Sequence, residues 1–292
     1  MGFNTVGVVG AGQMGQGITQ LVATRGFHVV LYDIDLHALE GAQEQITGGL
    51  NKAVKKGILT EWVREKTLKN LKITSKFEDL GYCDLVIEAV PEKEEMKLEV
   101  FEGLEEICPE STLFASNTSS LPITRLAACT DRKKQFIGLH FMNPVPIMEL
   151  VEVVRGWHTS DETFDQIQEF VKKLGKTLIV SKDYPGFIVN RVLMPMINEA
   201  IFALTEGIGS PEDIDKAMTL GGGHPMGPFA LADMIGLDVC LDIMEIMHSE
   251  FGESKYRPAP LLRKYVEADM LGKKTGQGFY HYDDPDTPKL LK

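Results

Sequence analysis

The sequence predicts an α/β domain with a mostly parallel sheet over residues 1–184, followed by an all-helical domain over residues 185–292. As far as residue 180, short apolar runs alternate with amphipathic segments, which is typical of a parallel sheet covered by helices. Pro185 and Gly186 then mark a boundary, beyond which the apolar pattern is helical until the glycine-rich tail. A chain of 292 residues is long enough to build two separate cores.

Composition and charge argue against several kinds of partner. Forty-two acidic and thirty basic side chains give a net charge of −12, which disfavours a nucleic-acid surface or an anionic membrane as partner. The four cysteines are far apart and have no histidine at metal-ligand spacing, so we predict reduced thiols and no metal site. No apolar run approaches the roughly 18 residues of a membrane span, and the first ten residues lack the pattern of a secretion signal. A cytoplasmic location is therefore expected.

The first strand runs directly into a glycine-rich turn. Strand Thr5–Val9 is followed by G-A-G-Q-M-G over residues 10–15, an apolar-periodic helix, and a second strand over residues 28–32. The three glycines permit a tight turn, close approach of the backbone to a pyrophosphate, and close packing of helix on strand. This order indicates a Rossmann-type dinucleotide site, although a turn retained only for chain reversal would look similar. The turn residues expected at the cofactor are Gly10, Gly12, Gln13, Met14 and Gly15.

The acid that ends the second strand predicts which dinucleotide binds. Asp33 follows Gly15 by eighteen residues, where a carboxylate accepts hydrogen bonds from an adenosine ribose and repels a 2′-phosphate. The next residues, Ile34 and Asp35, provide no arginine to bind such a phosphate. The predicted cofactor is therefore NAD.

A cluster of lysines ends the next helix, which we predict over residues 36–56 with Gly57 closing it. Lys52, Lys55 and Lys56 lie in its last turn, where they complement the helix dipole. One interpretation is a solvated face. The other is a docking point for an anionic part of a substrate, as a local exception in an acidic chain.

The other elements of the α/β domain continue the alternation. A buried strand, D-L-V-I-E-A-V, begins at Asp84 and ends near Glu88. Further helices are predicted over residues 61–69, 94–107 and 161–174, and further strands over 71–74, 112–115, 136–139, 148–154 and 177–180.

A polar cluster, S-N-T-S-S over residues 116–120, follows one of these strands. Such a cluster is usually a helix cap, here before Pro122. In a chain of alternating strands and helices, however, ligands bind at the carboxyl ends of the strands. Asn117 and Ser119 are therefore expected on the same sheet edge as the glycine turn. A serine nucleophile is not indicated, because no G-x-S-x-G elbow surrounds these residues.

His140 follows the apolar strand 136–139, and a turn with Asn143 and two prolines connects it to a strand that contains Glu152. The neighbours of Glu152 are leucine and valine on both sides, so its carboxylate is expected to be buried. An unpaired buried charge costs several kcal/mol, and His140 is the nearest candidate partner. A lone histidine beside a strand is more often a packing or surface residue, so the rest of the chain must decide.

The helical domain begins with a long apolar segment over residues 187–204, followed by helical patterns over 211–220 and 229–247. The first segment is apolar nearly all round, which predicts a buried spine and part of a subunit interface. Asn190 and Arg191 lie in its first turns. A polar pair there is normally a cap or a tie between domains, but it is also well placed to meet a ligand.

Together these motifs resemble the 3-hydroxyacyl-CoA dehydrogenases, and most strongly the short bacterial 3-hydroxybutyryl-CoA dehydrogenases. The matching runs are V-V-G-A-G-Q-M-G, D-L-V-I-E-A-V, A-S-N-T-S-S-L, G-L-H-F-M-N-P-V-P, L-V-E-V-V, P-G-F-I-V-N-R, H-P-M-G-P-F and G-K-K-T-G-Q-G-F-Y. They span almost the whole chain in the order of the family. One departure is Met142, where the family commonly has phenylalanine, and this conservative change affects no assigned role.

The resemblance implies reversible, NAD-dependent oxidation of (S)-3-hydroxybutyryl-CoA to acetoacetyl-CoA. It implies that His140 is the general base, that Glu152 holds its imidazole, and that Ser119 and Asn190 donate hydrogen bonds to the substrate oxygen. It places Lys56 at the CoA part of the substrate and implies a homodimer formed through the helical domain. The residues it places at the dinucleotide are Asp33, Glu92, Lys97, Ser119, Asn143 and Lys274, and Asn117 lies on the same edge.

Two other interpretations stay open on the sequence. A dehydrogenase of a free hydroxy acid such as gulonate would use the same nucleotide turn and a similar histidine and glutamate, but would need no lysines for CoA. A non-catalytic structural protein of the crystallin kind would keep the fold and lose the chemistry. The presence of Ser119, His140, Glu152 and Asn190 together argues against this last interpretation.

Overall fold

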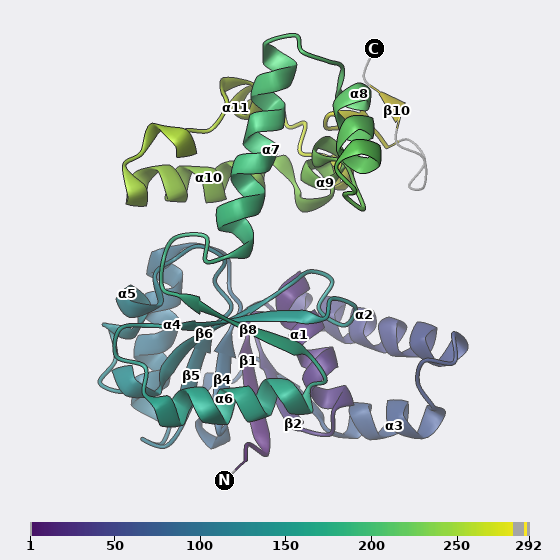
Figure 1. Ribbon diagram of the computed structural model, residues 1–292. Coiled ribbons are helices and arrows are strands. Elements are labelled where there is room, and N and C mark those ends of the chain that lie inside the picture. The colour runs from purple at the N-terminus through teal and green to yellow at the C-terminus, as the bar shows by residue number, and fades with distance from the viewer. Residues whose placement is uncertain (1, 283–288, 291–292) are drawn as a thin grey trace. The chain divides into compact units, whose positions relative to one another are not determined.

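The computed structural model describes residues 2–282 and 289–290, and the chain divides into two compact units, Met1–Tyr184 and Pro185–Lys292 (Figure 1). The division follows Tyr184, next to the Pro185-Gly186 pair, where Gly186 has a φ of 77° that a side chain would disfavour. The first unit contains a single large sheet with helices on both faces, and the second is mostly helical, which confirms the predicted fold class.

The sheet of the first unit has eight strands in the order β3-β2-β1-β4-β5-β6-β7-β8. All neighbouring strands are parallel except β6 and β7, which are antiparallel. The chain runs outward from β1 in one direction to β3 and in the other to β8, so the switch in strand order lies between β1 and β4, where dinucleotides bind. The strand bounds are β1 Thr5–Val9, β2 His28–Tyr32, β3 Leu71–Thr74, β4 Leu85–Glu88, β5 Leu113–Ser116, β6 Phe136–Phe141, β7 Leu150–Arg155 and β8 Thr177–Lys182.

Helices cover both faces of this sheet because successive strand side chains point to opposite sides. Phe114 of β5 and Phe136 of β6 contact Phe101 of α4, whereas their neighbours Ala115 and Ile137 belong to the core shared with α1 and α6. The helix bounds are α1 Gln13–Thr24, α2 Leu36–Lys55, α3 Glu61–Lys69, α4 Glu94–Ile107, α5 Ile123–Ala127 and α6 Asp161–Lys173, with short 3₁₀ turns at η1 Phe77–Tyr82 and η2 Lys133–Gln135.

The second unit has its own core, built mainly on α7, α9, α10 and α11. Its helices are α7 Val189–Thr205, α8 Pro211–Lys216, α9 Pro228–Ile235, α10 Leu237–Phe251 and α11 Pro260–Glu267. A π-helical turn, η3 Ala217–Gly221, extends α8, and η4 Ser254–Tyr256 and η5 Lys273–Thr275 are short 3₁₀ turns. Two short antiparallel strands, β9 Tyr280–His281 and β10 Lys289–Leu290, lie near the C-terminus.

The structure corrects one sequence expectation in this unit. The single helical stretch predicted over residues 229–247 is two helices, because Gly236 has a φ of 107° and breaks the helical backbone between α9 and α10. In the segment predicted as a buried spine, Met194, Ile197 and Ile201 of α7 are buried, whereas Val192 is 69% exposed in the single chain. Across the described residues, no helix combines the length and apolarity needed to cross a membrane.

Candidate active site

The glycine turn between β1 and α1 leaves no room for side chains at two of its three glycines. Gly10 has a φ of 106°, and a Cβ there would lie 2.7 Å from the carbonyl oxygen of Ala89. A Cβ on Gly15 would lie 1.8 Å from the carbonyl oxygen of Gly10. A Cβ on Gly12 would meet no atom of the described residues within 4 Å, so the backbone at the start of α1 faces open space. This geometry suits a phosphate held against the helix N-terminus.

The carboxylate of Asp33 is fixed by the backbone on both sides. Its Oδ2 accepts a hydrogen bond from the Ala11 N–H at 2.7 Å, and its Oδ1 accepts one from the Asp35 N–H at 2.9 Å. Each carboxylate oxygen has a further lone pair for another donor. Asp33 thus connects the end of β2 to the glycine turn and presents acceptor oxygens at the same edge of the sheet.

A cavity of about 810 Å³ runs along this edge, entirely within the first unit. Its walls include the glycine turn and Asp33 at one end, and Glu92, Asn117 and Ser119 at the other. The cavity therefore extends across the switch in strand order, and its volume is within the range of pockets that bind cofactors.

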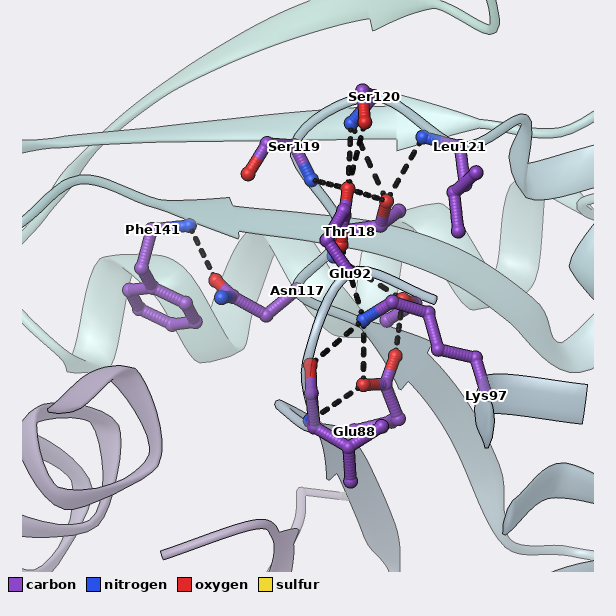
Figure 2. Close-up of polar contacts among 11 residues, drawn as sticks. Glu88, Glu92, Lys97, Asn117, Thr118, Ser119, Ser120, Leu121 and Phe141 are labelled. Carbon is purple, nitrogen blue, oxygen red and sulfur yellow. Dashed lines mark hydrogen bonds and ion pairs between the residues drawn. The ribbon is translucent and has the colours of Figure 1, made fainter. Parts of the chain in front are cut away.

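Beside the cavity lies a network of buried charges and hydroxyl groups, shown in Figure 2. Lys97 of α4 is 1% exposed, and its Nζ lies 2.7 Å from Glu88 Oε1 and 3.2 Å from Glu92 Oε2. Asn117 Oδ1 accepts a hydrogen bond of 2.9 Å from the Phe141 N–H, one residue beyond His140. This bond connects the polar segment after β5 to the end of β6.

His140 and Glu152 lie directly opposite each other on the antiparallel strands β6 and β7. His140 Nδ1 is 2.7 Å from Glu152 Oε2, and the two residues are 7% and 0% exposed. The strand β6 does not stop before the histidine, as the sequence suggested, but continues through His140 to Phe141. Both side chains are therefore held on regular strands, and the ring nitrogen that faces away from Glu152 is Nε2.

Lys176, a residue that the sequence did not single out, holds the connection between β6 and β7. Its ammonium donates hydrogen bonds to the carbonyl oxygens of Val145 at 2.9 Å and Met148 at 2.6 Å. Burial lowers the pKa of Lys176, and the charge of Arg25 lowers it further. No simple pattern signals this role, because the lysine follows a glycine turn and its acceptors are backbone atoms about thirty positions away.

The other predicted site residues lie elsewhere in the chain. Lys56 is the exposed C-cap residue of α2, and Asn143 is exposed in the connection after β6. Asn190 is the second residue of α7 and Lys274 lies in η5, so both belong to the second unit. Within that unit Lys274 Nζ forms an ion pair of 2.5 Å with Asp238.

The cysteines give no sign of redox or metal chemistry. All four fall within the described residues and are free thiols. Burial raises the pKa of Cys83 and Cys240 to about 12 and that of Cys108 and Cys129 to about 11, so the reactive thiolate is disfavoured. Among residues 2–282 and 289–290, no three histidine, cysteine or acidic side chains are grouped as metal ligands.

Comparison with known proteins identifies the family. Residues 5–184 match the family model for the NAD binding domain of 3-hydroxyacyl-CoA dehydrogenase, and residues 186–282 match the model for its C-terminal domain. A 3-hydroxybutyryl-CoA dehydrogenase of Bradyrhizobium diazoefficiens is 55% identical over 95% of this chain and 94% of its own length. The human mitochondrial hydroxyacyl-coenzyme A dehydrogenase is 45% identical over 95% of this chain and 90% of its own length.

Solved structures agree with this result. The crystal structure of (S)-3-hydroxybutyryl-CoA dehydrogenase PaaH1 from Ralstonia eutropha superposes with a TM-score of 0.92 at 48% identity, covering 97% of this chain and 100% of that one. The resemblance deduced from the motifs is thus confirmed over both units. The chain belongs to the 3-hydroxyacyl-CoA dehydrogenase family.

Proposed function

We propose that this protein catalyses the reversible, NAD-linked oxidation of (S)-3-hydroxybutyryl-CoA to acetoacetyl-CoA. The observation that carries the proposal is the buried pair of His140 and Glu152, whose nitrogen and oxygen are 2.7 Å apart at the sheet edge that also carries the cavity. The relatives from Bradyrhizobium and Ralstonia, named for 3-hydroxybutyryl-CoA, support a four-carbon acyl group as the substrate.

The residues at the glycine turn fit NAD. The backbone at Gly12 is open, the N-terminus of α1 favours a negative charge, and the fixed Asp33 carboxylate can accept hydrogen bonds from a ribose. A 2′-phosphate would bring a second negative charge against Asp33, which favours NAD over NADP. NAD, when bound, supplies the acceptor for the hydride that leaves C3 of the substrate. Further contacts with it are assigned to Glu92, Lys97, Ser119, Asn143 and Lys274, as the family resemblance implies, and to Asn117, which lines the same cavity.

His140 is assigned as the general base. In the oxidation its Nε2 takes the proton from the 3-hydroxyl group, and in the reduction it returns a proton to the ketone oxygen. Histidine suits both directions because imidazole accepts and donates protons near neutral pH. Glu152 accepts a hydrogen bond from Nδ1, which keeps the basic lone pair on Nε2 and stabilises the imidazolium that forms when the proton is taken.

The substrate is held by groups from separate segments of the chain. Ser119 and Asn190 donate hydrogen bonds to the oxygen that alternates between alcohol and ketone, so that charge developing on it meets fixed donors. Lys56 neutralises part of the anionic CoA moiety. In the second unit, Val192, Ile208 and Leu220 are exposed apolar side chains, which supports a homodimer formed through this unit. A cytoplasmic location stays a prediction from the sequence.

The experiment that tests this function follows NADH absorbance in the presence of acetoacetyl-CoA. We expect turnover with NADH, much slower turnover with NADPH, and none with free acids, whether keto acids with NADH or hydroxy acids such as gulonate with NAD. Faster turnover of the free acids than of the CoA thioester would refute the substrate assignment. No turnover of any hydroxyacyl-CoA or free acid, with NADH still bound, would favour a non-catalytic protein.

The role of His140 is tested by His140→Gln, with His158→Gln as a matched control at an exposed histidine. We expect His140→Gln to lower kcat roughly 10²- to 10⁴-fold, the usual contribution of a positioned proton-transfer group. The affinity for NADH, measured by its fluorescence, should stay nearly unchanged in both variants. Equal kcat values for the His140→Gln variant and the wild type would remove His140 from the mechanism.

A further inference from the structure

The carboxylate of Glu88 has no part in the mechanism above, yet it is among the most buried charged groups of the protein. Glu88 is the last residue of β4 and is 0% exposed. Its Oε1 accepts hydrogen bonds from the Val90 N–H and from Lys97 Nζ, each at 2.7 Å, and its Oε2 accepts one from Ser116 Oγ at 2.6 Å. A carboxylate is costly to bury, and these three donors offset that cost.

The ammonium group of Lys97 has three acceptors within the protein. Besides Glu88 Oε1, its Nζ lies 3.2 Å from the carbonyl oxygen of Val90 and 3.2 Å from Glu92 Oε2. An ammonium group has three donors, and these are three acceptors. Burial alone would lower the pKa of Lys97, but the charges of Glu88 and Glu92 outweigh it and raise the pKa, so the side chain stays cationic.

Glu92 connects this cation to the segment after β5, which we call the serine loop (residues 117–121). Glu92 Oε1 accepts hydrogen bonds from the N–H groups of Ser119 at 2.8 Å and Ser120 at 3.0 Å. It also accepts from the hydroxyl groups of Thr118 at 2.5 Å and Ser120 at 2.9 Å (Figure 2). Burial would raise the pKa of Glu92, but Lys97 and these donors together hold it below its ordinary value. One carboxylate oxygen therefore fixes three consecutive residues of the loop.

The serine loop carries two residues assigned to the site. Ser119 is in the loop itself, and Asn117 at its start accepts the hydrogen bond from the Phe141 N–H, next to His140. A displacement of the loop would therefore move Ser119, the donor to the substrate oxygen. Through Asn117 it would also move the end of β6, which carries His140.

We propose that Glu88 is a positioning residue, which holds Lys97 as a fixed internal cation so that Glu92 and the serine loop stay in place. This inference rests on the proposed function for its effect on turnover. This role of Lys97 adds to the contact with the dinucleotide that the family resemblance implies, since Lys97 also lines the cavity. Glu88 acts on the loop through Lys97 and Glu92.

The test uses Glu88→Gln, which keeps the shape of the side chain and an acceptor for Lys97 but removes the charge. Glu105→Gln is the matched control, because Glu105 lies on the same helix as Lys97 and pairs with the buried Arg132 at 2.7 Å, outside the serine loop and its hydrogen-bond partners. Hydrogen–deuterium exchange of residues 117–121 without ligands reports on the loop directly. The kcat and the KM values for NADH and acetoacetyl-CoA report on the site, and the Tm reports on stability.

We expect Glu88→Gln to speed amide exchange in the serine loop and to lower kcat at saturating NADH, each by roughly 10- to 100-fold, as for other coupled residues in one network. Glu105→Gln should lower the Tm and leave loop exchange and kcat unchanged. If Glu88→Gln does not fold, Glu88→Asp, which keeps the charge but draws the carboxylate back from Lys97, should give the same changes on a smaller scale. The inference fails if Glu88→Gln, or Glu88→Asp in its place, behaves as Glu105→Gln does.

The double variant Glu88→Gln/Lys97→Met removes one negative and one positive charge, so Glu88, Glu92 and position 97 together keep the net charge of −1. We expect it to lower kcat and to speed loop exchange together. A raised KM for NADH with kcat and loop exchange unchanged would overturn the inference. If the wild type turns over no hydroxyacyl-CoA, the proposed function fails alone, because loop exchange still decides the positioning role.

Discussion

The substitution Glu152→Gln isolates the charge of the catalytic pair, because glutamine has nearly the same size and can still accept a hydrogen bond from His140 Nδ1. Glu152 is 0% exposed and lies 2.7 Å from the imidazole, so solvent does not screen the interaction. A hydrogen bond to a charged partner contributes about 1.5–3 kcal/mol. If that stabilisation is fully available when the imidazolium forms, its loss lowers kcat by about 10- to 150-fold.

The assay is NAD reduction by (S)-3-hydroxybutyryl-CoA, the direction in which the imidazolium forms, with both substrates saturating, recorded across pH for the wild type and for Glu152→Gln. Glu149→Gln is the control, since it removes the same charge from an exposed position just before β7. We expect the control to keep kcat and the shape of the pH profile, whereas Glu152→Gln changes both. A Glu152→Gln enzyme with the kcat and pH profile of the wild type would show that the pairing has no catalytic consequence.

Three further predictions follow from single side chains. Lys56→Glu should raise the KM for acetoacetyl-CoA several-fold and leave the KM for NADH unchanged. Lys69→Glu, at an exposed position on α3, is its control. Equal changes in the two KM values of Lys56→Glu would contradict a role of Lys56 in CoA binding. Lys176→Met leaves two carbonyl groups without their donor at about 1 kcal/mol each, so the Tm should fall by several degrees and kcat severalfold, whereas Lys172→Met at an exposed position should change neither. Burial raises the pKa of Asp233 from 3.8 to about 6, against the opposing donors around it. The folded state therefore binds this proton more tightly than the unfolded state, and the stability of the wild type relative to Asp233→Asn should fall by about 3 kcal/mol as the pH rises from 4 to above 6. A constant difference in unfolding free energy over that range would contradict this assignment.

Some of the site followed from the sequence because strong local constraints leave a clear pattern. Three glycines at fixed spacing mark a turn where two side chains cannot fit, and the positions of Gly10 and Gly15 show that crowding directly. A carboxylate flanked by apolar residues on a strand indicates burial and hence a partner, and Glu152 is 0% exposed beside His140. In both cases the residues that carry the signal are adjacent in the chain.

Other features were missed because they depend on contacts between distant segments. Lys97 lies in the first turns of an amphipathic helix, where a lysine normally reaches solvent, and only the packing of α4 beside β4 places it between two acids. Gly236 lies within a continuous apolar pattern, so its positive φ and the break between α9 and α10 leave no signal in helical periodicity. The sequence predicts types of element well where the pattern is local, and it misses the exceptions that tertiary packing imposes.

The antiparallel pairing of β6 and β7 fixes the register of the two strands that carry His140 and Glu152. Residues on antiparallel strands face each other in fixed pairs, and β7 is also held from its other side by β8, which sets Glu152 against Ile179. Shifting β7 by a single position would turn Glu152 to the opposite face of the sheet. The two strands therefore cannot slide past each other, because the alignment of acid and base is set by the sheet and not by the segment 142–149 that connects them.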